Sequence, residues 1–212
     1  MKTSSGPASV RQHFNRFAIT TILAVGLLTV ARPAAAEIVY TPTNITIETN
    51  SSYNLDLNND GVTDFIISIS QEKSDICLDR PRYYNVTNTL AETPVSGNGA
   101  AGSLPTNLAT GDEIGPSQTF YGGTGTMAWH SSCPYSTGSW GGNWMGAKSC
   151  GFDCFIPIGL EGYLGLTFQI DGETHYGWAL VRVSSKAVRT SRLLGYAYET
   201  IANMPINAGQ TK

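Results

Sequence analysis

The residues best suited to chemistry form one nine-residue segment, residues 56–64, with the pattern D-x-N-x-D-G-x-x-D. Calcium prefers six to eight hard oxygen ligands at about 2.3–2.6 Å. The spacing of Asp56, Asn58 and Asp60 lets their side-chain oxygens surround one point, and the glycine that follows permits a sharp turn. Val62 offers its backbone carbonyl, and Asp64 completes the set. The segment therefore predicts a structural calcium site.

This segment differs from an EF-hand, because its twelfth position is Ile67 rather than glutamate and its flanks have the pattern of strands. It resembles the calcium loops between strands of FG-GAP-type propeller repeats, although a single copy implies no propeller. The alternative is a metal-free hairpin turn, because Asn, Asp and Gly are good turn formers. Three carboxylates within nine residues repel one another, and a turn alone gains nothing from that repulsion.

Four cysteines follow in the chain: Cys77, Cys133, Cys150 and Cys154. If the chain is exported to an oxidising compartment, an even number of cysteines predicts disulfide bonds, here two bonds in one of three pairings. A zinc site formed by all four cysteines is the alternative, but the C-x3-C spacing of the last pair is unlike the usual C-x2-C knuckle. We expect disulfides, with the pairing left open.

The catalytic candidates are weak. His175 falls in an alternating strand pattern and is expected to be structural, whereas His130 precedes Ser131 and Ser132 without a G-x-S-x-G elbow. A paired-carboxylate hydrolase would need two of five acids, and no spacing singles out a pair; these acids are Asp112, Glu113, Asp153, Glu161 and Glu199. We assign no catalytic residue and leave open whether the chain is an enzyme; a binding or structural module is favoured, with a secreted polysaccharide hydrolase as the alternative.

Aromatic residues in a Gly- and Ser-rich region offer a better functional lead. Trp129, Trp140 and Trp144 could stack on sugar rings if they are exposed. The alternative is that they form a local core, because tryptophan is mostly buried. They are therefore candidate ligand-binding residues, with carbohydrate or a cell-surface polymer as the expected partner.

The first 36 residues have the layout of a cleaved secretory signal peptide: a basic start, the apolar run Phe17–Ala31 and a small-residue A-x-A site before Glu37. The run is shorter than the ~20 residues of a membrane helix, so we expect no span after cleavage; an uncleaved anchor is the alternative.

Removing these 36 residues takes away four basic residues and no acid, so the net charge changes from −3 to 9 − 16 = −7. No Lys/Arg cluster is present, which argues against nucleic-acid binding. The expected location is extracellular or periplasmic.

Hydrophobic periodicity predicts an all-β fold for residues 37–212. Tyr163–Ile170 alternates, Asp171-Gly172 is a strong two-residue hairpin signal, and Glu173–Val183 returns. This turn sets the register so that Phe168 faces His175 and large residues face small ones on both sides. A further strand is expected over Arg192–Thr200. We predict one antiparallel β-sandwich or jelly roll in which residues 85–155 form a loop-rich, disulfide-stapled insertion with one or two short strands.

The C-terminal part of the chain contains three characteristic stretches: Tyr163–Phe168 (YLGLTF), Thr174–Ala179 (THYGWA) and Tyr196–Thr200 (YAYET). Together they resemble a β-rich module of uncharacterised bacterial exported proteins, which often carry PEP-CTERM-type sorting tails. A segment like Leu55–Phe65 is also typical of that module. The resemblance implies export and a β fold, and it lends no active site. The expected function is that of a secreted, calcium-stabilised binding or surface/structural module.

Overall fold

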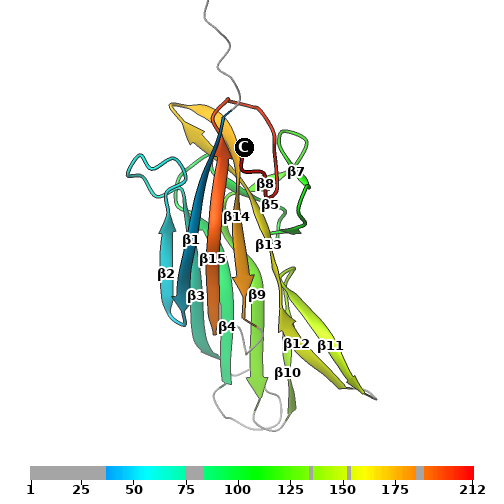
Figure 1. Ribbon diagram of the computed structural model, residues 1–212. Helices are drawn as coiled ribbons and strands as arrows, with labels where there is room; N and C mark the ends of the chain where they lie inside the picture. Colours follow the sequence, from blue (N-terminus) through cyan, green and yellow to red (C-terminus); the bar gives the residue numbers. More distant parts are fainter. Residues whose placement is uncertain (1–36, 75–83, 134–135, 152–153, 185–188) are drawn as a thin grey trace, which may run out of the picture. The chain divides into compact units, whose positions relative to one another are not determined.

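The computed structural model describes residues 37–74, 84–133, 136–151, 154–184 and 189–212. All of them belong to one compact unit. These residues form strands and connecting turns, with no helix among them (Figure 1). The described part of the chain accordingly holds no helix long and apolar enough to cross a membrane.

A seven-stranded antiparallel sheet forms one layer of the fold, with the order β1-β15-β14-β13-β5-β8 and with β6 also paired to β13. Its strands are β1 (Ile38–Glu48), β5 (Gly99–Ala101), β6 (Asn107–Leu108), β8 (Phe120–Tyr121), β13 (Glu161–Ile170), β14 (Glu173–Val183) and β15 (Thr190–Glu199).

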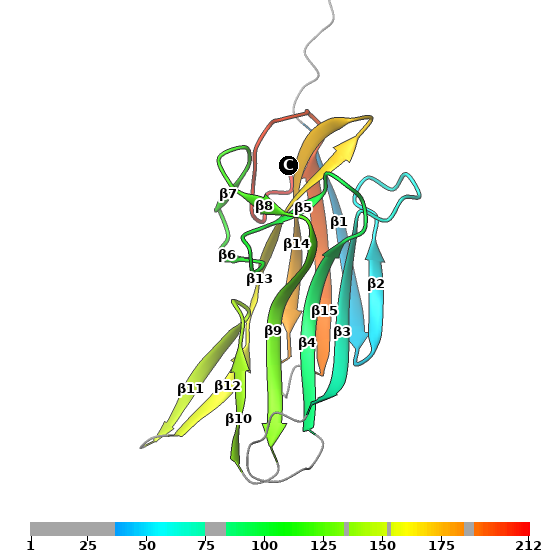
Figure 2. The same cartoon turned by 180° about the vertical axis from the view of Figure 1, so that it is seen from behind.

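A five-stranded antiparallel sheet forms the other layer, with the order β10-β9-β4-β3-β2. Its strands are β2 (Ser51–Leu55), β3 (Phe65–Ser74), β4 (Tyr84–Thr93), β9 (Gly123–Cys133) and β10 (Ser136–Gly141). The hairpin of β11 (Met145–Gly151) and β12 (Cys154–Gly159) extends away from the two layers (Figure 2).

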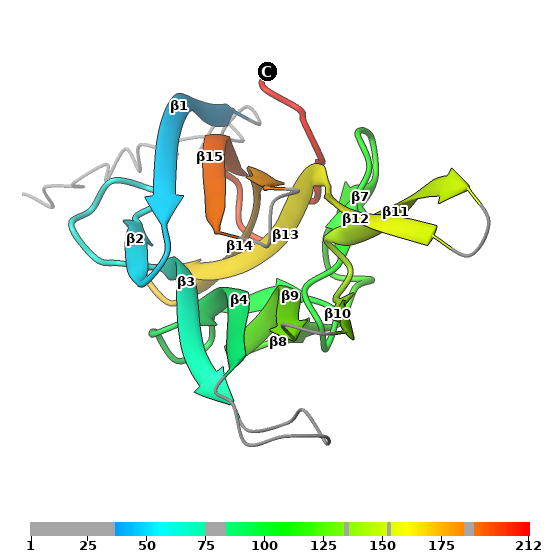
Figure 3. The ribbon, with the colours of Figure 1, turned by 90° about the horizontal axis from the view of Figure 1, so that it is seen from below.

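The main hydrophobic core lies between the two sheets, which Figure 3 shows as facing layers. Leu164, Leu166 and Phe168 enter it from β13, while Phe65 and Ile67 enter it from β3, and all five are fully buried. The fold is therefore an antiparallel β-sandwich, and the predicted fold class is confirmed.

The predicted hairpin is confirmed residue by residue. Asp171 and Gly172 both have positive φ, 52° and 82°, as a type I′ turn requires. Phe168 faces His175, and Gly165 faces Trp178 in the observed register. Local turn chemistry therefore set the pairing of β13 and β14.

The outer face of the seven-stranded sheet carries a second core. Tyr176 and Trp178 of β14 are buried there, and the indole Nε1 of Trp178 donates a hydrogen bond to the carbonyl of Gln210 at 3.0 Å. Ile114 and Ile206 cover this face where β7 (Glu113–Ile114) pairs with β16 (Ile206–Asn207). The sheet is thus buried on both faces, as the large-to-small pairing predicted.

The prediction that residues 85–155 are mostly loop is wrong. β4 and β9 lie in the interior of the five-stranded sheet and pair with each other from Asn85–Ser132 to Thr93–Gly123. The inward face of β4 consists of Thr87, Thr89 and Ala91, each at most 3% exposed. A pattern based on apolar residues misses such a strand, because threonine fills its buried positions. Within this region, residues 96–118 contain only short strands, as expected.

Candidate functional site

The predicted calcium segment is the connection between β2 and β3. Its ends are fixed, because Leu55 pairs with Phe65 and the backbone N–H of Asp64 donates to the carbonyl of Leu55 at 2.9 Å. Leu55, Leu57 and Phe65 are all buried in the main core. The loop is thus held at both ends by packing and by the strand ladder.

The interior of this loop is wound around the Asp56 carboxylate. Its Oδ1 accepts from the N–H of Asp60 at 3.2 Å, and its Oδ2 accepts from the N–H of Gly61 at 2.8 Å. Asp60 in turn accepts from the N–H of Val62 at 2.8 Å and from the amide Nδ2 of Asn58 at 2.9 Å. These bonds bring the oxygen-bearing groups of Asp56, Asn58 and Asp60 into one small turn.

One oxygen in this turn has no partner. Oδ1 of Asn58 is buried from solvent and accepts no hydrogen bond. An unsatisfied buried acceptor costs roughly 1–3 kcal/mol. A cation among the loop oxygens would satisfy it, so the donor set fits a hard divalent ion.

Asp64 lies beneath the turn and is only 4% exposed. Its Oδ2 accepts from the N–H of Leu57 at 2.8 Å, and Nδ2 of Asn98 donates to its backbone carbonyl at 3.1 Å. Burial raises the pKa of this carboxyl to about 6; the Leu57 bond opposes the rise, and the nearby Asp60 charge adds to it. Asp64 therefore closes the base of the loop and carries a charge that its surroundings do not favour.

Across the described ranges, no three Asp, Glu, His or Cys side chains converge as a metal-holding group. A calcium site here would therefore use the Asn58 amide and backbone carbonyls as well as carboxylates. Val62, whose carbonyl was predicted as a ligand, is exposed in the turn.

The three predicted ligand-binding tryptophans are placed differently from one another. Trp144 is fully buried in the main core, and its Nε1 donates to the carbonyl of Pro105 at 3.0 Å, so the ligand-stacking prediction does not fit it. Trp129 is half-buried on β9 and packs against Gly141. Trp140 pairs with His130 in the backbone ladder, and its side chain lies outside the described set.

The cysteine predictions also fall outside what the structure describes. Cys77 belongs to an undescribed segment, and only the backbone is described for Cys133, Cys150 and Cys154. The disulfides, like the signal peptide in residues 1–36, remain predictions.

The histidines raised as catalytic candidates occupy strand positions. His175 is 5% exposed, and its Nδ1 lies 2.9 Å from the carbonyl oxygen of Glu199 in a hydrogen bond. His130 is half-buried on β9, where burial and then the Arg189 charge lower its pKa.

The described acids among the hydrolase candidates include three with structural partners. Glu161 forms an ion pair with Arg182, Glu199 accepts from the N–H of Ile201 at 2.9 Å, and Asp112 accepts from the N–H of Ala109 at 2.8 Å. Asp153 lies outside the described residues.

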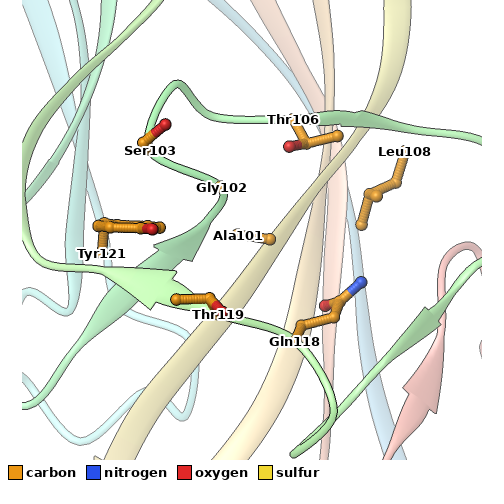
Figure 4. Close-up of a pocket in the computed structure, with 8 residues that line it drawn as sticks. All are labelled: Ala101, Gly102, Ser103, Thr106, Leu108, Gln118, Thr119 and Tyr121. Atoms are coloured by element: carbon orange, nitrogen blue, oxygen red, sulfur yellow. The ribbon is translucent and has the colours of Figure 1, made fainter.

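A cavity that sequence reasoning missed lies beside β5 and β8. It has a volume of about 270 Å³ and is bounded by residues 101–108 and 118–121 (Figure 4). The only sequence signal for it was the concentration of glycine and hydroxyl residues in 96–118, which predicted a loop but not a shape.

The fold and the loop together define a β-sandwich with an aspartate-rich hairpin connection at one edge. Comparison with protein-family models, with curated proteins and with solved structures finds no significant match to this chain.

Proposed function

We propose that residues 37–212 are an exported, calcium-stabilised β-sandwich that acts as a binding or surface/structural module. The observation that carries the calcium part is the buried, unpartnered Oδ1 of Asn58 inside a turn that also holds Asp56 and Asp60. In a turn with no metal-binding role, an N–H group would donate a hydrogen bond to that oxygen. In a cation site, the oxygen stays unpaired so that it can bind the ion.

Electrostatics support the same proposal. The loop carries three carboxylates in nine residues, and the charges of Asp60 and Asp56 both raise the pKa of Asp64. A bound divalent cation would offset this repulsion and favour the ionised form of Asp64. Side-chain oxygens of Asp56, Asn58 and Asp60 and the carbonyl of Val62 would hold the ion. Asp64 does not converge with the other two carboxylates in the described structure, so it would have to turn toward the ion to complete the predicted set.

The position of the loop suggests a structural role for the ion. β2 is one of the two edge strands of the five-stranded sheet, and the loop joins it to β3. Edge strands have unpaired backbone groups on one side and depend on their connections for order. Calcium would therefore stabilise this edge.

The expected size of the effect follows from mass action. Extracellular calcium modules bind with Kd of roughly 10⁻⁴–10⁻³ M. Calcium at 10 mM would then stabilise the folded state by about 1.4–2.7 kcal/mol. In a domain of this size the midpoint temperature Tm would rise by roughly 3–11 °C.

Titration of the mature chain with calcium, followed by calorimetry and thermal melting, tests this proposal. We expect one binding event and a Tm that falls on addition of EDTA. Asp60→Asn should abolish both effects. Asp171→Asn is the matched control, because it makes the same change in the exposed turn of another hairpin. A wild-type Tm that is the same in calcium and in EDTA would refute the calcium role.

Export is supported by the residue pattern of the first 36 residues. Fractionation of cells that produce the full chain should place it outside the cytoplasmic membrane, with Glu37 as the mature N-terminus. Non-reducing mass spectrometry of that material should show a mass lower by four hydrogen atoms than that of the fully reduced chain, as two disulfides require. Recovery of the intact precursor in the cytoplasm would contradict this part of the proposal.

A further inference from the structure

The cavity beside β5 and β8 has a lining suited to one class of ligand. Its floor is apolar, because it is formed by the buried residues Ala101 and Leu108. Its polar lining consists of hydroxyl and amide side chains, namely Ser103, Thr106, Gln118, Thr119 and Tyr121. Figure 4 shows Ser103 and Thr106 on one side and Thr119 and Gln118 on the other, with Ala101 between them. None of the lining residues is charged, although the mature chain carries 16 acidic residues.

An unpartnered acceptor belongs to this lining. Oε1 of Gln118 is buried and accepts no hydrogen bond. The backbone of Gln118 is held in place by its N–H bond to the carbonyl of Gly115 at 3.1 Å. The side-chain oxygen can therefore accept a hydrogen bond, and a hydroxyl group of a ligand could donate it.

Tyr121 adds a flat apolar face. Its side chain is 48% exposed, which makes it one of the most exposed large aromatic residues in the described chain. β8 pairs with β5 so that Tyr121 faces Ala100, and this pairing places the ring at the side of the cavity. A tyrosine ring with a free hydroxyl can contact an apolar C–H face and bond to a polar group at once.

The walls are preorganised by the backbone. The N–H of Gly102 donates to the carbonyl of Thr119 at 3.1 Å, and the N–H of Thr106 donates to the carbonyl of Ala101 at 2.9 Å. Gly102 has a φ of 85°, and a Cβ there would clash with Oγ1 of Thr106. The turn is therefore tight and requires glycine at this position.

Contacts from outside the cavity hold the same turn. Nε1 of the buried Trp144 donates to the carbonyl of Pro105, and Nδ2 of Asn143 donates to the carbonyl of Leu104, both at 3.0 Å. A ligand would thus meet a wall that is already in place, which reduces the entropy lost on binding.

We propose that this cavity binds one neutral sugar unit of a polysaccharide, with Gln118 as a hydrogen-bond acceptor and Tyr121 as the stacking face. This inference deepens the binding role proposed above and rests on it. A sugar ring combines hydroxyl groups with apolar C–H faces, which matches the hydroxyl, amide and aromatic lining. The volume of about 270 Å³ lies just below the ~300–1,000 Å³ of sites for drug-sized ligands, which suits a single ring.

Saturation-transfer NMR and calorimetry with neutral hexose oligomers test this inference. The probes are cellohexaose, laminarihexaose, maltohexaose and mannohexaose, and an oligogalacturonate serves as the acidic comparison. We expect at least one neutral oligomer to bind and the acidic one to bind at least tenfold more weakly. Tyr121→Ala and Gln118→Leu should each weaken binding at least tenfold, and Tyr121→Phe should retain most of it.

Tyr40→Ala is the matched control. Tyr40 is 40% exposed and lies on β1, at the opposite edge of the same sheet from β8. Circular dichroism of each variant establishes that it is folded. The proposal is overturned if no neutral oligomer binds the folded wild type, or if binding survives both Tyr121→Ala and Gln118→Leu.

The same titrations in EDTA, well below Tm, separate this proposal from the calcium proposal. If only the calcium proposal is wrong, calorimetry shows no heat of calcium binding while sugar binding is retained. Failure of the sugar site alone appears as a calcium-dependent Tm with no sugar binding.

Discussion

Replacement of Asp64 by asparagine should change how the stability of the calcium-free protein depends on pH. Burial raises the folded-state pKa of Asp64 from 3.8 to about 6, and the charges of Asp60 and Asp56 add to the rise. A raised carboxyl pKa means that the folded state favours the protonated form. The associated stability is therefore fully present below about pH 4 and is lost as the pH rises through about 6.

The magnitude follows from the size of this pKa change. One pKa unit corresponds to about 1.4 kcal/mol, so the full loss is about 3 kcal/mol, of which roughly 2.5 kcal/mol falls between pH 4 and pH 7. Asparagine cannot ionise, yet its amide oxygen can still accept from the N–H of Leu57, which Asp64 Oδ2 bonds at 2.8 Å. In EDTA, the free energy of unfolding of wild type minus that of Asp64→Asn should therefore fall by roughly 2.5 kcal/mol between pH 4 and pH 7.

Urea denaturation at several pH values between 4 and 7.5 measures this difference. Calcium at 10 mM should recover much of the wild-type loss at pH 7, because the cation favours the ionised carboxylate, and it should leave Asp64→Asn largely unchanged. Asp171→Asn controls for the general effect of removing one negative charge. Parallel pH curves for wild type and Asp64→Asn in EDTA would refute the reasoning.

Four further substitutions test the framework around the two sites. Asn98→Ala should lower the free energy of unfolding by about 2–4 kcal/mol in urea denaturation, because it leaves the carbonyl of Asp64 and the N–H of Gln169 unpaired; an unchanged midpoint would contradict this. Gly102→Ala should lower Tm and abolish sugar binding measured by calorimetry. The reason is that φ at this position is 85° and the new Cβ would lie 2.9 Å from the carbonyl oxygen of Leu104. A variant with wild-type Tm and affinity would argue against a tight turn. Trp144→Ala should lower the free energy of unfolding by about 3–5 kcal/mol in the same denaturation assay, because Trp144 is fully buried. Trp129 is only half-buried, so Trp129→Ala should lower it by clearly less. Equal losses for the two variants would contradict the assigned burial.

Local sequence determined the β13–β14 hairpin completely. Asp171 and Gly172 favour a two-residue turn, and that turn fixes the pairing of the two strands from Glu161–Arg182 to Ile170–Glu173. The end points of the 56–64 loop also followed from the sequence, because turn-forming residues separate two strand patterns there. In both cases the interacting residues are neighbours in the chain, so their types alone carry the information.

Tertiary structure alone decided the interior of the five-stranded sheet and the environment of the aromatic residues. The strands β4 and β9 bury Thr87, Thr89 and Ala128, whose small or polar side chains give no apolar pattern until a facing sheet covers them. Trp144 is buried in the main core, where the carbonyl of Pro105, 39 residues away in the chain, accepts a hydrogen bond from its indole N–H. The cavity likewise exists only because the β5–β8 pairing brings Gly102 against Thr119, and no local pattern encodes a contact between segments that the chain separates.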